Sequence, residues 1–281
     1  MYKNRLYKEF EEQERQMGYN KKNRRRKEEV MTAVSPKIEV KDEELIPDKV
    51  KYVKPMTEGQ EDYIACMAEE PITLCYGVAG TGKTTVAVML ACQYLCEKKI
   101  EKILITRPIV ATSVKVLGAM PGDLGQKFDP YLMPIYEQLN KYFGPMKAKK
   151  LLDEKVIEAC PLELLRGRTF DKTFITVDEA QNCTFEQLQM VLTRIGKDSK
   201  LVINGDFEQS DLKYEQGAFE DCVDLLEDVP GVGVIELTED DIVRSPLIKG
   251  ILKALRGREK LLKEREEEKR YQNPPRSSRF S

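Results

Sequence analysis

Short apolar runs alternate with helix-like segments through the middle of the chain. The runs are residues 72–76, 102–106, 173–177, 200–204 and 233–237. Each reads as a continuous apolar stretch, which is typical of strands that are buried on both faces. The pattern therefore predicts an α/β fold of three layers, in which helices cover both faces of a mostly parallel central sheet.

Two stretches carry signals for the start of a helix. Thr184 followed by Gln187 has the form of a capping box, and Gly196 is expected to end that helix as a left-handed residue. Ser245 followed by Pro246 predicts an N-cap with proline at the first helical position. Apolar residues then recur at helical spacing, so a second helix is expected there.

Composition divides the chain into three parts. Residues 1–50 are rich in charged side chains and are expected to form a flexible or transiently helical arm. Residues 51–256 contain the predicted sheet, and residues 257–281 are expected to form a charged helical extension and a tail. With 281 residues, 41% of them hydrophobic, the chain can bury a full core.

The N-terminus carries charges where a signal peptide would be apolar, and no run approaches the roughly 18 consecutive apolar residues of a membrane span. We therefore expect a cytoplasmic protein that does not contact a membrane. Seven cysteines without a C-x-x-C pair predict reduced, mostly buried thiols.

The chain contains no histidine. This absence excludes Ser-His-Asp hydrolysis, Cys-His proteolysis and every mechanism that needs a histidine metal ligand. Any chemistry must rest on carboxylates, lysine, arginine, amides and a bound metal ion.

Charge is unevenly distributed, although the net charge is only −2. Residues 1–30 carry 10 basic and 6 acidic side chains and residues 249–281 carry 11 and 5, which leaves 25 basic and 37 acidic side chains between them. The densest basic cluster, residues 21–27, could hold the phosphates of a nucleic acid. A solvated tail that keeps the chain soluble explains the same cluster.

The segment GVAGTGKT, residues 77–84, matches the phosphate-loop pattern G-x-x-x-x-G-K-[ST] between a predicted strand and a predicted helix. The loop predicts a site for a nucleoside triphosphate, in which Lys83 reaches the β and γ phosphates and the Thr84 hydroxyl binds Mg²⁺. A glycine-rich turn without function is the alternative. The expected nucleotide-binding residues are Gly77, Val78, Ala79, Gly80, Thr81, Gly82, Lys83, Thr84 and Thr85.

Two acidic residues follow the run 173–177. Asp178 is expected at the carboxyl end of a strand, where it could hold Mg²⁺ through water, and Glu179 could polarise the attacking water. A solvated strand end explains the same pair. Gln209, after the run 200–204, could contact the γ-phosphate or the water, although from this stretch alone a polar turn is the better explanation.

The chain resembles the PhoH-like ATPases in a series of motifs that keep their order and spacing. They read GVAGTGKT, TRPIV, LGAMPGDLGQKFDPYLMPIYEQL, LLRGRTF, FITVDEAQNCTFEQLQMVLTRIG, NGDFEQSDL and DIVRSPLIKGIL. The resemblance runs from about Pro55 to Leu255. Its middle section is specific, because DEAQN, TRIG and GD-x-x-Q-x-DL are not shared as a set by other phosphate-loop proteins.

The resemblance implies a RecA-like P-loop NTPase core, similar to the first motor domain of superfamily 1 helicases. By this likeness Gln60 reads the adenine edge, Gln209 senses the γ-phosphate and Arg107 lies near nucleic acid. Arg244 is implied to be a catalytic cation, in its own subunit or across a ring interface.

Three departures from the family shape these expectations. Lys213 stands where many members have proline. Only about 50 residues precede the ATPase segment, so we expect no PIN nuclease domain, and no second RecA-like domain is expected after Leu255. A motor of this kind would work as a homo-oligomer, and the family resemblance implies a ring, with a hexamer as the expected size.

The leading hypothesis is an Mg²⁺-dependent ATPase that couples hydrolysis to binding or remodelling of nucleic acid, RNA in preference to DNA. Three alternatives remain open from the sequence. The chain could be a phosphotransferase, an ATP-switched scaffold that recruits a nuclease or replication partner, or a nucleic-acid-binding protein whose basic ends do the main work.

Overall fold

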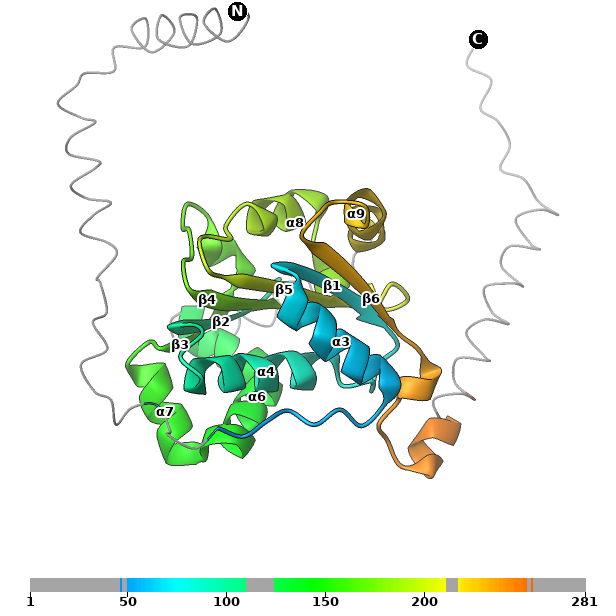
Figure 1. Ribbon diagram of the computed structural model, residues 1–281, viewed down its shortest axis with the longest axis horizontal. Helices are drawn as coiled ribbons and strands as arrows, with labels where there is room; N and C mark the ends of the chain where they lie inside the picture. The colour runs from blue at the N-terminus through cyan, green and yellow to red at the C-terminus, as the bar shows by residue number, and fades with distance from the viewer. Residues whose placement is uncertain (1–45, 47–49, 110–123, 211–216, 252–253, 255–281) are drawn as a thin grey trace, which may run out of the picture. The chain divides into compact units, whose positions relative to one another are not determined.

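The computed structural model describes residues 46, 50–109, 124–210, 217–251 and 254, without the side chains of residues 124–131 (Figure 1). Most of the predicted arm, with its basic cluster at residues 21–27, lies outside the described residues. So do the predicted extension at residues 257–281 and the departure at Lys213.

Among the described residues, six strands form one sheet at the centre of the fold, in the order β3-β2-β4-β5-β1-β6. All neighbouring strands are parallel. The strands are β1 (Ile72–Gly77), β2 (Lys102–Arg107), β3 (Ile157–Pro161), β4 (Thr173–Val177), β5 (Lys200–Gly205) and β6 (Val232–Leu237). The five predicted runs all form strands, which confirms the predicted α/β fold with a mostly parallel sheet. The edge strand β3 was not predicted.

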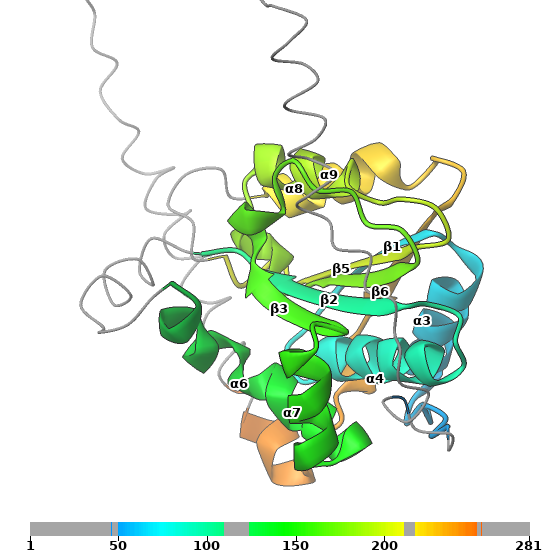
Figure 2. The same ribbon diagram turned by 90° about the vertical axis from the view of Figure 1, so that its left-hand side faces the viewer.

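Helices cover both faces of the sheet, as Figures 1 and 2 show from two directions. One face carries α3 (Glu58–Glu69), α4 (Lys83–Cys96), α6 (Leu124–Phe143) and α7 (Pro145–Asp153). The opposite face carries α8 (Phe185–Leu192), α9 (Ala218–Leu226) and the short helix η1 (Leu162–Leu165). Two further short helices are η2 (Ala180–Asn182) and η3 (Glu239–Asp241). The three layers agree with the prediction.

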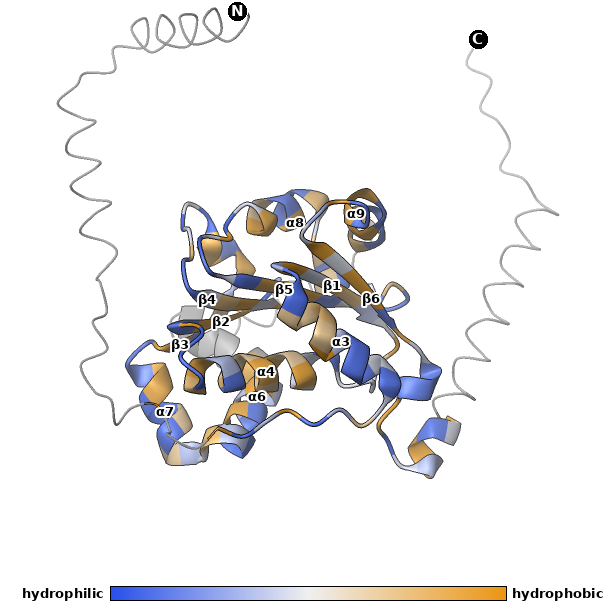
Figure 3. Ribbon diagram, viewed as in Figure 1, coloured by the Kyte–Doolittle hydropathy of each residue, from blue (hydrophilic) through white to orange (hydrophobic). Residues whose placement is uncertain are grey.

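The strands supply side chains to two separate hydrophobic cores. Because successive side chains of a strand point to opposite faces, Leu74 packs in one core and its neighbour Cys75 in the other. All five residues of β4 are buried. In Figure 3 the hydrophobic colour is concentrated in the strands and on the helix faces turned towards them. The continuous apolar runs in the sequence arise from this burial on both faces.

The predicted helix starts are confirmed, whereas one predicted helix end is wrong. Thr184 and Gln187 form the capping box of α8, and the Ser245 carbonyl accepts a hydrogen bond from the Lys249 N–H at 3.0 Å in the helix that follows Pro246. However, α8 ends at Leu192. Gly196 instead pairs with a neighbouring segment, and its N–H donates to the Phe170 carbonyl at 2.7 Å. A Cβ at Gly196 would lie 2.5 Å from that oxygen, so close approach accounts for the glycine.

The seven cysteines are free thiols, and all except Cys66 are buried, as predicted. Among the described residues, no helix is long and apolar enough to cross a membrane.

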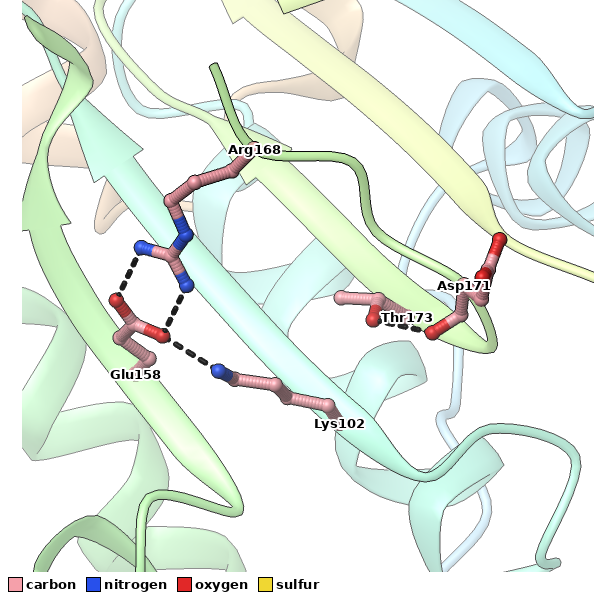
Figure 4. Close-up of polar contacts among 5 residues, drawn as sticks. All are labelled: Lys102, Glu158, Arg168, Asp171 and Thr173. Atoms are coloured by element: carbon pink, nitrogen blue, oxygen red, sulfur yellow. Dashed lines mark hydrogen bonds and ion pairs between the residues drawn. The ribbon is translucent and has the colours of Figure 1, made fainter. Parts of the chain in front are cut away.

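A cluster of charges fastens the edge strand β3 to the sheet (Figure 4). The Glu158 carboxylate accepts two hydrogen bonds from the Arg168 guanidinium, at 2.6 and 2.8 Å, and one from Lys102 at 2.5 Å. Burial alone would raise the pKa of Glu158, but the hydrogen bonds from Arg168 and Lys102 outweigh it and lower the pKa to about 2. Nearby, the Thr173 hydroxyl donates to the Asp171 carbonyl at 2.7 Å and orders the turn before β4.

We predict that Glu158→Gln lowers the free energy of unfolding by about 2 kcal/mol near pH 7, because it leaves two half-buried cations without their anion. The native pKa of Glu158 lies below the usual 4.5, so its ionised form stabilises the fold above about pH 4.5. That contribution declines as the pH falls towards 2. Urea unfolding of both proteins near pH 7 and near pH 3 measures the difference.

The control is Glu101→Gln, which removes the partner of Lys172 from a pair whose side chains are 61% and 53% exposed. An exposed pair of this kind contributes little, so this variant should unfold close to the parent protein. Equal losses for the two variants, or a Glu158 effect that is undiminished near pH 3, would contradict the prediction.

Candidate functional site

The loop between β1 and α4 has the backbone of a phosphate cradle. Gly77, Gly80 and Gly82 all have positive φ, at 139°, 91° and 87°. A Cβ at Gly77 would lie 1.9 Å from the Leu237 carbonyl oxygen of the neighbouring strand β6, so no other residue fits there. The loop leads directly into α4 at Lys83. Its N–H groups therefore converge at a helix N-terminus, which is a favourable site for an anion.

Lys83 lies over the loop that it follows. Its amine donates to the carbonyls of Gly77, at 2.5 Å, and Val78, at 3.1 Å. Burial lowers the pKa of this amine, although the charges of Asp206, Asp178 and Glu179 oppose the shift. A phosphate anion at the loop would compensate the buried cation in the same way.

The two predicted metal ligands are brought together by the fold. The Thr84 hydroxyl donates to Oδ1 of Asp178 at 2.7 Å. The second oxygen of Asp178 accepts from the Arg107 guanidinium, from Nε at 3.0 Å and from Nη2 at 2.5 Å. The Asp178 side chain is only 4% exposed. Arg107 therefore lies against the site, where it is paired with a carboxylate.

Hard oxygen ligands from a hydroxyl and a carboxylate suit Mg²⁺, so the residues present fit this ion. Among the described residues, no group of three or more carboxylate or thiolate side chains could hold a metal ion by itself. Magnesium usually needs no such cage, because it keeps several waters and binds through one or two protein ligands together with substrate phosphates.

Glu179 adopts a backbone conformation that few non-glycine residues favour, with φ 60° and ψ 41°. Burial, and next the charge of Asp178, raise the pKa of its carboxyl group, while Arg107 and the hydrogen bond from Gln181 act in the opposite direction. Strained backbone and a shifted pKa are common at catalytic positions. Both features are consistent with the predicted role of Glu179 as the group that polarises water.

Gln181 is a site residue that the sequence analysis missed. Its amide N–H donates to Glu179 at 2.7 Å, while its side-chain oxygen accepts the backbone N–H of Asp206 at 3.0 Å. Its own carbonyl accepts from the Ser210 hydroxyl at 3.0 Å. Gln181 thus links the acidic pair to the loop that carries Gln209. The segment DEAQ was the available signal, but an uncharged residue two positions after the acid did not stand out.

Gln60 is buried at 3% exposure and touches the phosphate loop. Its Nε2 donates to the Thr81 carbonyl at 2.8 Å, and its Oε1 accepts the Met56 N–H at 2.9 Å. The amide therefore holds the loop against the segment that precedes α3. One amide proton and one lone pair of the oxygen remain for a nucleobase.

Gln209 and Arg244 approach the loop from two other segments. Gln209 is exposed at the cavity and donates its backbone N–H to the Asp206 carbonyl at 3.2 Å. The neighbour of Arg244, Val243, donates its N–H to the Gly80 carbonyl at 3.0 Å. A Cβ at Gly80 would lie 3.5 Å from both Cγ and Nε of Arg244. Arg244 therefore lies beside the loop of its own chain.

Most of the predicted site residues line one cavity of about 930 Å³. It continues along α4 past Met89 to Gln138 and Lys141 of α6, which leaves room for a base and ribose beyond the phosphates. Gly77, Val78 and Thr81 do not line the cavity. The carbonyls of Gly77 and Val78 accept hydrogen bonds from Lys83, and Thr81 is buried. The predicted residues that line the cavity are Gln60, Ala79, Gly80, Gly82, Lys83, Thr84, Thr85, Asp178, Glu179, Gln209 and Arg244.

Comparisons with known proteins identify relatives of this chain. The chain is 42% identical over 203 residues to a PhoH-like protein of Synechocystis sp., covering 72% of this chain and 62% of that protein. It is 41% identical over 207 residues to a PhoH-like protein of Bacillus subtilis, covering 73% of this chain and 65% of that protein. The chain thus spans less than two thirds of the length of these relatives.

Among solved structures, the large terminase of a thermophilic bacteriophage matches with a TM-score of 0.42 and 13% identity, over 71% of this chain and 50% of the terminase. The family model described as PhoH-like protein matches residues 52–256, which include the whole sheet and the entire candidate site. The chain therefore belongs to the PhoH-like protein family.

Proposed function

We propose that this chain is an Mg²⁺-dependent ATPase of the cytoplasm that couples ATP hydrolysis to binding or remodelling of nucleic acid, with RNA preferred over DNA. The observation that carries the ATPase half is the convergence of Lys83, Thr84, Asp178 and Glu179 in one cavity beside the phosphate loop. Each of these residues lies at the start of a helix or directly after a strand, so the arrangement does not depend on a flexible surface loop.

Each residue has a separate part in this proposal. The loop N–H groups and Lys83 bind the phosphates, Thr84 and Asp178 hold Mg²⁺, and Glu179 orients and polarises the attacking water. The metal, when bound, would neutralise charge on the phosphates. Gln181 keeps the Glu179 carboxylate in place and connects it with the loop of Gln209. A γ-phosphate at Gln209 would thereby act on the same hydrogen-bond chain as the catalytic acid.

Charge and the family resemblance support the coupling to nucleic acid. The basic clusters near the chain ends favour a polyanionic partner, and the family resemblance suggests a ring of subunits. An ATP-switched scaffold with little turnover is the second candidate. Hydrogen bonds connect Glu179 with Gln181 and Gln181 with Ser210, so a change of bound nucleotide could alter the surface near Ser210.

We predict that Lys83→Ala lowers the ATP turnover number about 10²-fold or more, since it removes the cation at the transferred phosphate. Glu179→Gln should keep ATP affinity but lose turnover. Release of ADP and phosphate, together with binding of a fluorescent ATP analogue, measures both quantities. Lys172→Ala, at an exposed pair, is the matched control. Parental turnover in Glu179→Gln would exclude Glu179 as the water-activating residue.

Arg244 should act on the nucleotide of its own subunit, because it lies beside its own Gly80. We expect Arg244→Ala to lower turnover about 10²-fold with ATP affinity largely retained. Mixing Arg244→Ala subunits with Lys83→Ala subunits tests the arrangement. An arginine that acts within its subunit cannot rescue a neighbour, so the mixture should stay inactive; recovered turnover in mixed assemblies would show that Arg244 acts across an interface.

Single-stranded RNA should stimulate turnover more than single-stranded DNA or duplexes. Because phosphate contacts release counterions, the apparent RNA affinity should fall by about tenfold or more between low and physiological salt. Turnover measured with each polymer at two salt concentrations gives the result. Removal of residues 1–50 tests whether the arm supplies the affinity. If no polymer changes turnover, the scaffold is favoured over the motor.

A further inference from the structure

Arg107 and Asp178 form a largely buried ion pair in which two guanidinium nitrogens share one carboxylate oxygen. Both Nε and Nη2 of the guanidinium donate to the same oxygen, Oδ2, at 3.0 and 2.5 Å. The side chains are only 16% and 4% exposed. A charged pair at this depth interacts more strongly than a surface pair, because less water screens it.

The sheet itself creates this pair. β2 and β4 are parallel neighbours in which Thr106 lies opposite Val177. The next residues of the two strands are Arg107 and Asp178, and the Asp178 N–H continues the ladder by donating to the Thr106 carbonyl at 2.9 Å. The guanidinium is therefore held beside the carboxylate by backbone pairing, not by chance contact of two flexible side chains.

Both oxygens of Asp178 are already engaged in this structure, one by the Thr84 hydroxyl and the other by Arg107. On the proposed function, the same carboxylate helps to hold Mg²⁺. A guanidinium on this carboxylate lowers the negative potential that a cation would find there, and its donors compete for the lone pairs that would bind the waters of the metal.

We propose that the positive charge of Arg107 keeps the metal site from binding a divalent cation in the absence of nucleotide. The proposal rests on the proposed function, since it assumes that Thr84 and Asp178 form the metal site. A cation then binds well only together with a triphosphate, whose own negative charge outweighs the repulsion from the guanidinium. Arg107 thereby makes metal binding and nucleotide binding depend on each other.

Arg107 has two opposing effects on metal affinity. It fixes the orientation of Asp178, which favours binding, and it places a positive charge beside the site, which opposes binding. Charge repulsion is the larger effect, because Thr84 also holds Asp178 by a hydrogen bond of 2.7 Å and keeps its orientation without Arg107. Lys83 and Glu179 contribute the same charges whether Arg107 is present or not.

The test is a titration of the full chain with Mn²⁺, as a probe for Mg²⁺, in the absence of nucleotide. The electron paramagnetic resonance signal of the unbound ion measures how much Mn²⁺ has bound. Arg107→Gln removes the charge and keeps a donor for Asp178. We expect this variant to bind free Mn²⁺ about tenfold or more tightly than the parent protein, the equivalent of about 1.4 kcal/mol. Arg107→Lys, which retains the charge, should resemble the parent.

A second measurement adds a non-hydrolysable ATP analogue. The analogue should increase Mn²⁺ affinity strongly in the parent and clearly less in Arg107→Gln, because the variant has already lost the repulsion. Arg168→Gln is the matched control, since it neutralises another arginine that is paired with a carboxylate, at Glu158, away from the site. It should bind Mn²⁺ as the parent does. Arg107→Met serves as a second neutral variant if Arg107→Gln does not fold.

The outcomes separate this proposal from the proposed function. Equal affinity of free Mn²⁺ for the parent and for both neutral variants, with that affinity abolished by Asp178→Asn, overturns the role of Arg107 and leaves the metal site intact. Mn²⁺ affinity that is unaffected by Asp178→Asn, with and without the analogue, overturns the metal site and with it both proposals. A gain in the neutral variants that disappears on adding Asp178→Asn supports Arg107 as proposed.

Discussion

The candidate site depends on the parallel pairing of β5 with β1 on one side and with β4 on the other. In this register Tyr76 lies opposite Gly205, and Val177 lies opposite Ile203. Since all three strands run the same way, the loops that follow them meet at one edge of the sheet. The bond of 2.7 Å between Thr84 and Asp178 joins residues 94 positions apart, and only this register brings them together. A slip of one residue would turn Asp178 to the other face.

Most of the sheet could be predicted because its strands are buried on both faces. Their apolar runs follow from that burial, and five of the six strands were predicted from such runs. β3 was not predicted because Glu158 interrupts its apolar run. The charge is acceptable there only through Arg168 and Lys102, which come from other segments. The prediction of the end of α8 was wrong because a glycine can be needed for two different reasons. Gly196 is needed for close approach to Phe170, but the sequence alone does not distinguish this from a glycine in a left-handed turn.

The site was predictable to the extent that its chemistry lies in contiguous motifs. The phosphate loop and the acidic pair needed only local spacing and a preceding strand. Gln181 and the partner of Arg107 needed contacts between distant segments, which no single motif displays. Gln60 illustrates an intermediate case. Its position near the nucleotide was implied by family resemblance, whereas its bonds to Thr81 and Met56 give it a further part in holding the loop.

The balance of charge around the loop explains why backbone geometry matters so much there. Asp178, Glu179 and Asp206 all act on the buried amine of Lys83, so carboxylates surround the place where a triphosphate would bind on the proposed function. Their field opposes a bare polyanion. Lys83 alone does not compensate for it, because one cation faces three carboxylates. Phosphate binding must therefore draw on the loop N–H groups, the helix N-terminus and a metal ion together. This requirement accounts for the positive-φ glycines, whose backbone leaves no side chain between the N–H groups and the anion.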